Sequence, residues 1–254
     1  MPENGSNADY ALVVDGIVKR FGTLQTLSGV SLRVRPGEKR ALIGPNGAGK
    51  TSLFNIIGGQ WPASGGRVHL FGRRIDRMSP HRRAALGISR TFQITNLFLD
   101  LTVEDNIVLA LQGLRRGKLN LFKPRALNRP LRNEAAEILE RGFMLPRRGE
   151  LVKNLSYGQQ RILEVLVAIA AGPKVLLLDE PTAGLSPHET ERMITRLQHL
   201  GEGLTVVVIE HDMDVCFRLV DTITVLHHGT VLADGTKEEV RENPAVQEIY
   251  LGVA

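Results

Sequence analysis

Short, largely apolar runs separated by helical patterns dominate the middle and the C-terminal part of the chain. Residues 40–43, 175–178 and 204–209 are runs of this kind, and each is long enough for one strand. Because they do not alternate between apolar and polar residues, they are typical of parallel strands covered on both faces. Apolar residues at helical spacing precede each of the two later runs, within 157–169 and 187–200. The alternation predicts an α/β core with a mainly parallel sheet.

Other patterns flank and interrupt this core. Residues 10–34 read as short strands with intervening turns, which predicts an N-terminal antiparallel β-region. From residue 101 to 141 the pattern becomes helical, and Thr102 and Asn133 are candidate caps for two helices. A hairpin is predicted around His228-Gly229, before a helical tail.

We therefore expect a single domain over residues 1–254. Its core covers about 8–95 and 155–254, and a helical subdomain at about 96–154 is inserted between the two parts.

The composition is that of an ordinary soluble globular protein, with 43% hydrophobic and 23% charged residues. No apolar run approaches the length needed to cross a bilayer, and the first nine residues are polar and acidic, unlike a secretory signal. The single cysteine, Cys216, excludes an intrachain disulfide and fits a reducing compartment. The net charge of +5 permits an anionic partner without identifying one.

A segment between a predicted strand and a predicted helix matches the phosphate-binding pattern G-x-x-x-x-G-K-[ST]. Glycines let the backbone curl so that successive N–H groups point at phosphate oxygens, and the helix that starts here adds its positive dipole end. Lys50 can reach the β- and γ-phosphates, and the Thr51 hydroxyl is a hard oxygen ligand suited to Mg²⁺. A chance glycine-rich turn is disfavoured by the complete match in this context. The candidate nucleotide-binding residues are Gly44, Pro45, Asn46, Gly47, Ala48, Gly49, Lys50, Thr51 and Ser52.

Two carboxylates, Asp179 and Glu180, close the apolar run at 175–178. Ligands bind at such strand ends in parallel sheets. Asp179 can hold Mg²⁺ through its water shell, and Glu180 can polarise an attacking water. Acids at a strand end are common by chance, so this assignment depends on the phosphate-binding loop beside it.

Three further residues are ordinary by themselves. Gln93 ends a predicted strand and is by default a surface polar group; it becomes interesting if it points at the γ-phosphate. His211 follows the strand at 204–209, where capping or solvent exposure is the usual role, but its order after the other motifs favours catalysis. Phe21 is by default a hairpin aromatic, and the alternative is stacking on a base.

Residues 113–132 are rich in Arg, Lys and Pro. A solvated connection is the default interpretation of such a segment. Contact with anionic lipid head groups is the functional alternative. Nucleic-acid binding is weaker still, because only Phe122 is interleaved as a stacking platform.

In order along the chain, these motifs resemble those of the ATP-binding cassette (ABC) family. The family's glutamine loop matches at Gln93, its signature appears as L-S-Y-G-Q at 155–159, its D-loop matches at 183–186, and its switch histidine matches at His211. The resemblance covers nearly the whole chain. It is closer to the ATPase subunits of branched-chain amino-acid importers, through residues 90–93, 155–161, 210–213 and 249–252.

The resemblance implies a P-loop NTPase (RecA-like) core with an N-terminal antiparallel β-region and an inserted α-helical subdomain. It implies an ATP hydrolase that uses Mg²⁺ and pairs head to tail, either with a second copy or with a close relative. ATP would then lie between the phosphate-binding loop of one subunit and the signature of the other.

The resemblance also assigns roles. Ser156, Gly158 and Gln159 would meet the nucleotide of the opposite subunit, and Phe21 would stack on adenine. The catalytic residues would be Glu180, His211 and Gln93. The metal would be held by Thr51, Gln93 and Asp179.

The implied partners are transmembrane permease subunits, a second ABC ATPase subunit and an extracytoplasmic solute-binding protein, with no nucleic acid. The implied location is the cytoplasmic face of the inner membrane, reached through the permease subunits.

The chain departs from the family pattern at three positions. The third signature residue is Tyr157 rather than Gly, which the importer subgroup tolerates. Ser186 replaces the D-loop acid, so an Asp-mediated contact across the dimer is in doubt. Phe21 replaces the usual Tyr and keeps the π-face.

Other readings stay open at this point. The same core serves lipid or lipopolysaccharide exporters, and a urea or amide importer is a further alternative. A soluble non-transport ABC ATPase is disfavoured, because the chain shows neither a duplicated cassette nor a coiled-coil insertion. A GTPase or a nucleotide kinase is disfavoured by the signature and by the lack of an N-K-x-D motif after the loop.

Overall fold

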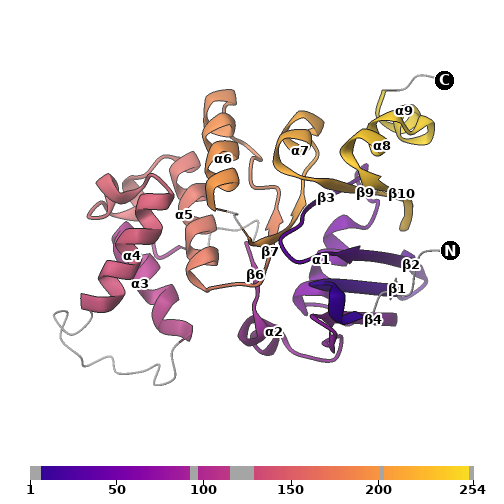
Figure 1. The fold of residues 1–254 in the computed structure, drawn as a ribbon, viewed down its shortest axis with the longest axis horizontal. Coiled ribbons are helices and arrows are strands. Elements are labelled where there is room, and N and C mark those ends of the chain that lie inside the picture. Colours follow the sequence, from indigo (N-terminus) through magenta and orange to yellow (C-terminus); the bar gives the residue numbers. More distant parts are fainter. Residues whose placement is uncertain (1–6, 92–96, 115–128, 201–202, 252–254) are drawn as a thin grey trace.

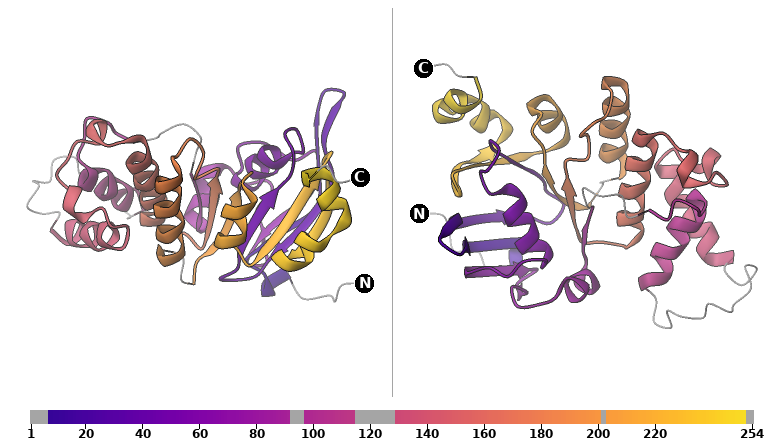
Figure 2. Two further views of the ribbon diagram at one scale, coloured as in Figure 1. Left: turned by 90° about the horizontal axis from the view of Figure 1, so that it is seen from above. Right: turned by 180° about the vertical axis from the view of Figure 1, so that it is seen from behind.

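Two β-sheets with surrounding helices make up the computed structural model (Figure 1). A group of helices lies at the end of the molecule away from both termini, in all three views (Figures 1 and 2). The structure describes residues 7–91, 97–114, 129–200 and 203–251.

A six-stranded sheet forms the centre of the molecule. The three apolar runs become neighbouring strands in it, and every pair is parallel except β10 with β9. The predicted, mainly parallel sheet is thus confirmed, and the strands that precede the candidate site residues end at one edge. In sheet order the strands are β10 (Thr230–Thr236), β9 (Thr222–His227), β3 (Lys39–Ile43), β8 (Thr205–Ile209), β7 (Val175–Asp179) and β6 (Ile88–Arg90).

The predicted N-terminal β-region is a four-stranded antiparallel sheet. Its strands in order are β2 (Leu24–Val34), β1 (Leu12–Phe21), β4 (Gly65–Leu70) and β5 (Arg73–Arg74).

Helices of 6 to 14 residues surround the sheets. None in the described part of the chain is long and apolar enough to cross a membrane. In chain order they are α1 (Lys50–Gly58), α2 (Pro80–Leu86), α3 (Val103–Leu114), α4 (Arg129–Arg141), α5 (Tyr157–Ala170), α6 (Pro187–Leu200), α7 (Met213–Leu219), α8 (Lys237–Glu242) and α9 (Pro244–Leu251). Short 3₁₀ turns lie at Asn7–Asp9, Leu145–Arg147 and Val152–Asn154.

Alternate residues of β7 enter two different hydrophobic cores. Val175 and Leu177 pack in a core with residues of α1 and of the four-stranded sheet. Leu176 and Leu178 pack in the other core with residues of α5 and α6. All four are at most 2% exposed, as a strand covered on both faces requires. Consequently α1 and α5 lie on opposite faces of the six-stranded sheet.

The segment between β6 and α5 is helical where the structure describes it, as predicted. The Thr102 hydroxyl accepts a hydrogen bond from the Asp105 N–H at 3.1 Å and caps α3. The expectation that Asn133 caps the second helix is wrong. The helix α4 begins before Asn133 and carries Pro130 in its first turn, a signal for a helix start.

A buried arginine holds the C-terminal end of α1. Arg83 of α2 is 2% exposed and donates to the carbonyl oxygens of Ile56 and Ile57. The last carbonyls of a helix lack the usual donor four residues on, although that of Ile56 also accepts from the Gly59 N–H at 3.2 Å, and a positive charge is favourable at this end of a helix dipole. The contact fixes α1, whose other end adjoins the phosphate-binding loop.

Candidate functional site

The predicted phosphate-binding loop, residues 44–49, connects β3 to α1. Gly44 and Gly49 have φ angles of +149° and +103°. A Cβ atom at Gly44 would lie 2.1 Å from the Leu226 carbonyl oxygen, and one at Gly49 would lie 2.6 Å from the Leu27 side chain. Glycine is therefore required at both positions by conformation and by space. The curled loop leaves the first N–H groups of α1 available to an anion.

Lys50, the first residue of α1, turns back over the loop. Its Nζ donates to the carbonyl oxygens of Gly44 at 2.6 Å and Pro45 at 3.0 Å, and the residue is 8% exposed. Burial lowers the pKa of Lys50, whereas the negative charges of Glu180 and Asp179 act to raise it. The ammonium group thus lies among oxygen atoms beside the loop, where it can meet a phosphate.

The loop borders an open cleft of about 240 Å³. Most of the predicted nucleotide-binding residues line it, and Glu180 reaches it from the end of β7. Thr26 of β2 also lines it, although the sequence did not suggest this residue. The lining consists of Thr26, Asn46, Gly47, Ala48, Gly49, Lys50, Thr51, Ser52 and Glu180.

Asp179 and Glu180 both act electrostatically on Lys50. Consecutive residues of a strand normally point to opposite faces, so the backbone must change direction here. Glu180 has a φ of +47°, which is uncommon for a residue with a side chain, and its N–H donates to the Ile209 carbonyl at 3.0 Å. This turn brings Glu180 into the cleft lining, while Asp179 stays 2% exposed.

The carboxylate of Asp179 is held by the neighbouring strand. Its Oδ2 accepts from Nη2 of Arg90 at 2.8 Å, and its N–H donates to the Thr91 hydroxyl at 3.3 Å. Its Oδ1 is buried and has no hydrogen-bond partner among the described residues. A buried carboxylate oxygen of this kind is expected to have a water or ion partner.

This donor set fits Mg²⁺. In proteins Mg²⁺ is commonly bound by one or two carboxylates together with substrate phosphates and water. Asp179 and the exposed Thr51 can supply oxygen atoms of that type. Across the described ranges, no cluster of three or more His, Cys, Asp or Glu residues could hold a metal ion by itself. The nucleotide phosphates would therefore have to complete the coordination.

Glu210, the residue after β8, is completely buried. Its Oε1 accepts from the N–H of Thr182 at 3.1 Å and from the Thr182 hydroxyl at 2.7 Å. Burial raises the pKa of Glu210, and the hydrogen bonds from Thr182 only partly offset this. Its Oε2 lies 4.0 Å from Nδ1 of His211, whose side chain is 64% exposed.

Phe21, the candidate base-stacking residue, is 42% exposed and belongs to a small aromatic cluster. Its ring meets that of Trp61 edge to face, with 5.1 Å between centroids. The ammonium of Lys19 lies 4.5 Å from the centroid of the Phe21 ring and donates to the Pro62 carbonyl at 2.8 Å. The Phe21 ring is thus held in place by contacts with Trp61 and Lys19.

The signature-like segment forms the start of α5. Ser156 caps this helix: its hydroxyl accepts from the Gln159 N–H at 3.3 Å, and the Gln159 side chain accepts from the Ser156 N–H at 2.9 Å. A Cβ atom at Gly158 would lie 2.5 Å from a carboxylate oxygen of Glu189. A side chain at position 158 would therefore have to displace the carboxylate of Glu189.

The two unusual residues of the signature and D-loop make contacts within the chain. The Tyr157 hydroxyl donates to the Ala183 carbonyl at 3.4 Å and accepts from Nε of Arg161 at 3.0 Å. The Ser186 hydroxyl accepts from the Glu189 N–H at 3.4 Å and caps α6. Tyr157 thus connects the signature to the D-loop, and Ser186 serves the start of the next helix.

The structure brings together the loop, Asp179 and Glu180. Phe21, His211 and the signature residues are not among the described residues that line the cleft. Gln93 lies outside the described residues, so its predicted place near the γ-phosphate stays a prediction. The same holds for the part of the basic segment between residues 115 and 128.

The sequence analysis gave no role to several residues beside the site. They adjoin site residues because β6, β7 and β8 are neighbours in the sheet. The sequence feature that could have identified them is their place at or just after the ends of parallel strands, where ligands bind. They are Arg90, Thr91, Thr182 and Glu210.

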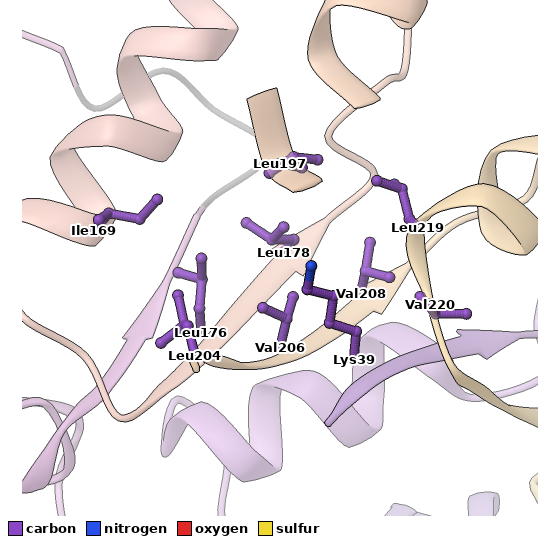
Figure 3. A pocket seen from close by; sticks show the side chains of 10 residues that line it. All are labelled: Lys39, Ile169, Leu176, Leu178, Leu197, Leu204, Val206, Val208, Leu219 and Val220. Carbon is purple, nitrogen blue, oxygen red and sulfur yellow. The ribbon is translucent and has the colours of Figure 1, made fainter. Parts of the chain in front are cut away.

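A second pocket lies between the opposite face of the sheet and helices α5 and α6 (Figure 3). Its volume of about 20 Å³ is roughly that needed for one water molecule. Its lining is aliphatic apart from Lys39 and includes no residue of the phosphate-binding loop, so this pocket is not the candidate nucleotide site. The lining residues are Lys39, Ile169, Leu176, Leu178, Leu197, Leu204, Val206, Val208, Leu219 and Val220.

Comparison with protein families gives two matches. Residues 27–183 match the family model described as ABC transporter. Residues 230–254 match the model described as branched-chain amino acid ATP-binding cassette transporter.

Individual relatives agree with these matches. The high-affinity branched-chain amino acid transport ATP-binding protein LivG of Salmonella typhimurium is 40% identical over 250 residues, which cover 96% of this chain and 98% of LivG. The crystal structure of the ADP conformation of MJ1267, an ATP-binding cassette of an ABC transporter, is 32% identical with a TM-score of 0.83, covering 96% and 99% of the two chains. A dimeric post-hydrolysis structure of the cassette MJ0796, bound to ADP and Pi, is 27% identical with a TM-score of 0.75, covering 89% and 98%.

Proposed function

This chain belongs to the ABC transporter family of ATPases, and we propose that it is the ATP-hydrolysing subunit of an importer for branched-chain or related amino acids. The observation that carries the substrate class is the similarity to LivG over 96% of the chain, together with the match of residues 230–254 to the branched-chain amino acid model.

ATP binds in the cleft at the phosphate-binding loop. The N–H groups of the loop and of the first turn of α1 hold the phosphate oxygens, and Lys50 exchanges the carbonyls of Gly44 and Pro45 for the β- and γ-phosphates. Adenine stacks on Phe21. Thr51, Asp179 and Gln93 would hold Mg²⁺, and the ion would supply positive charge beside the phosphates.

Hydrolysis depends on the residues at the ends of β7 and β8. Glu180 lines the cleft and accepts a proton from the water that attacks the γ-phosphorus, while the bond to the β-phosphate oxygen breaks. His211 and Gln93 position the γ-phosphate and the attacking water. Stabilisation of the developing charge by Lys50 and by backbone N–H groups supplies much of the rate.

The active unit is a head-to-tail dimer. Residues 156–159 start α5, whereas the phosphate-binding loop precedes α1 on the opposite face of the sheet. The absence of the signature from the described cleft lining supports its supply by a second subunit. The dimeric MJ0796 structure with ADP and Pi supports a dimer as the active unit. The partner is a second copy or a close relative, and closure of the dimer around ATP is the motion that transport uses.

The remaining partners are membrane permease subunits and an extracytoplasmic solute-binding protein. The protein lies at the cytoplasmic face of the cell membrane through the permease. Phe98 and Leu99, which are 60% and 45% exposed and follow shortly after Gln93 in the chain, offer apolar surface to the permease subunits.

The test is reconstitution. The chain is co-purified with its permease subunits, placed in liposomes with the solute-binding protein, and assayed for ATP-dependent uptake of labelled leucine. We expect uptake that is competed by valine and isoleucine and abolished without ATP. A complex that instead takes up urea or an amide, or moves lipid outward, would overturn the substrate class and leave the ATPase assignment intact.

A further inference from the structure

The buried carboxylate of Glu210 has one oxygen in use and one that points at a candidate catalytic residue. Oε1 receives both hydrogen bonds from Thr182, at 3.1 and 2.7 Å. Oε2 is buried without a hydrogen-bond partner among the described residues, and Nδ1 of His211 lies 4.0 Å from it. A completely buried carboxylate oxygen without a donor costs free energy, so a structure that retains one implies a partner in another state.

His211 is the side chain that can become that partner. Its imidazole is 64% exposed and can rotate, whereas Glu210 is fixed by burial and by Thr182. Hydrogen bonds of catalytic groups are often long before the substrate binds and tighten in the complex. The other carboxylate nearby, Asp212, already caps α7 by accepting from the N–H groups of Asp214 and Val215.

We propose that Glu210 is the positioning residue of His211: in the ATP-closed state Oε2 accepts the Nδ1–H of His211, and the unprotonated Nε2 is thereby directed to accept a hydrogen bond from the water that attacks the γ-phosphorus. This inference rests on the proposed function, because His211 needs a bound nucleotide to act on. A carboxylate that accepts from one ring nitrogen fixes both the tautomer and the orientation of an imidazole.

The same carboxylate connects the two halves of the candidate catalytic machinery. Thr182, which binds Oε1, lies two residues after Glu180, and the Glu180 N–H donates to the carbonyl of Ile209, the residue before Glu210. The ends of β7 and β8 therefore hold Glu180 and His211 in a fixed relation. Cys216 and Asp212 are the other titratable groups beside this cluster, and Cys216 is buried.

The test is a double-mutant cycle on the full-length protein with Glu210→Gln, His211→Ala and the combination. Glu210→Gln keeps the size of the side chain and an oxygen that accepts from Thr182. It replaces the negatively charged oxygen facing His211 with a neutral amide group. We expect the kcat for ATP hydrolysis to fall about 10- to 100-fold in Glu210→Gln, less than the roughly 10²- to 10⁴-fold effect of a general acid–base group itself because Glu210 acts through His211, with less than a twofold change in the Kd for ATP. Added to His211→Ala, Glu210→Gln should cost nothing further, since it acts only through that residue.

A spectroscopic measurement separates positioning from a structural role. In ¹⁵N-histidine-labelled protein trapped with ATP, His211 should carry its proton on Nδ1 in wild type and lose that preference in Glu210→Gln. Glu242→Gln, the same chemical change at an exposed position, is the control and should alter neither kcat nor the His211 signal.

The outcomes separate this inference from the proposed function. Additive losses in the double mutant, or an unchanged His211 signal in Glu210→Gln, would overturn the positioning role alone. An unchanged kcat in His211→Ala would remove His211 from the proposed mechanism and this inference with it.

Discussion

The guanidinium of Arg90 on β6 is paired with the carboxylate of Asp179 at the end of β7, at 2.8 Å between Nη2 and Oδ2. Both side chains are at most 7% exposed. Nη1 of the same arginine donates to the Asn55 side chain on α1 at 2.7 Å. One buried cation therefore connects the acidic strand with the helix of the phosphate-binding loop.

Replacing Arg90 with Met should destabilise the protein strongly. It leaves the buried charge of Asp179 without its partner, and breaking such a pair typically costs about 3–5 kcal/mol. Urea unfolding of Arg90→Met should show a loss of that order. Arg82→Met, at an exposed position of α2, is the matched control and should cost less than about 0.5 kcal/mol. Equal losses in the two variants would show that the pair is not important to stability.

Lys50→Ala should weaken nucleotide binding. The variant removes a charge-assisted hydrogen bond worth about 1.5–3 kcal/mol, which corresponds to about a 10- to 100-fold higher Kd for ATP. Calorimetric titration of ATP measures this directly. Lys174→Ala, an exposed lysine outside the cleft lining, should bind as wild type does. Unchanged affinity in Lys50→Ala would mean that nucleotide binds elsewhere.

Trp61 should report base binding, because it is the only tryptophan and its ring lies 5.1 Å from that of Phe21. We expect its fluorescence to change on titration with ADP. Phe21→Ala should raise the Kd about 5- to 100-fold, since base–aromatic stacking contributes about 1–3 kcal/mol. Phe21→Tyr keeps the ring and should keep the affinity. Wild-type affinity in Phe21→Ala would exclude stacking on this ring.

Glu38 should make folding stability depend on pH in the acid range. Burial by itself would raise its pKa, but hydrogen bonds from Thr222 and from the Arg35 N–H and the charge of Arg40 bring the pKa below its ordinary value of 4.5. A lowered folded-state pKa stabilises the protein above pH 4.5, and this contribution is lost as the pH falls through the folded-state value.

Glu38→Gln should therefore be less stable than wild type at pH 7, and the difference should shrink below pH 4. Unfolding in urea at both pH values measures it. A difference that is constant or grows in acid would show that the ionised carboxylate is not favoured in the folded state.

The parts of the site that depend on local order along the chain were predictable from sequence. The spacing of Gly44, Gly49 and Lys50 is itself the geometry of the loop, and the apolar run before Asp179 identifies a buried parallel strand. The capping boxes at Ser156 and Ser186 are equally local, because a cap and its partner are three residues apart.

Contacts between distant segments were not predictable in this way. Arg90 and Asp179 are 89 positions apart and meet only because β6 is the neighbour of β7, which no single-sequence pattern specifies. Thr182 and Glu210 meet for a similar reason across β7 and β8. The wrong prediction of a cap at Asn133 has a local cause. Asn is a good capping residue, but here it lies inside a helix whose start is marked by Pro130.

The most direct test of the account is one sample of Glu180→Gln, in which ATP affinity, hydrolysis rate and dimer fraction are all measured. The change keeps the size of the side chain and removes its charge and its ability to accept a proton. Lys50, Thr51 and Phe21 are untouched, so ATP should bind at least as well as in wild type. Hydrolysis should fall about 10²- to 10⁴-fold, and the protein should accumulate as an ATP-bound dimer. Near-normal turnover would contradict the catalytic role of Glu180, and slow turnover with monomer alone at saturating ATP would contradict the head-to-tail dimer.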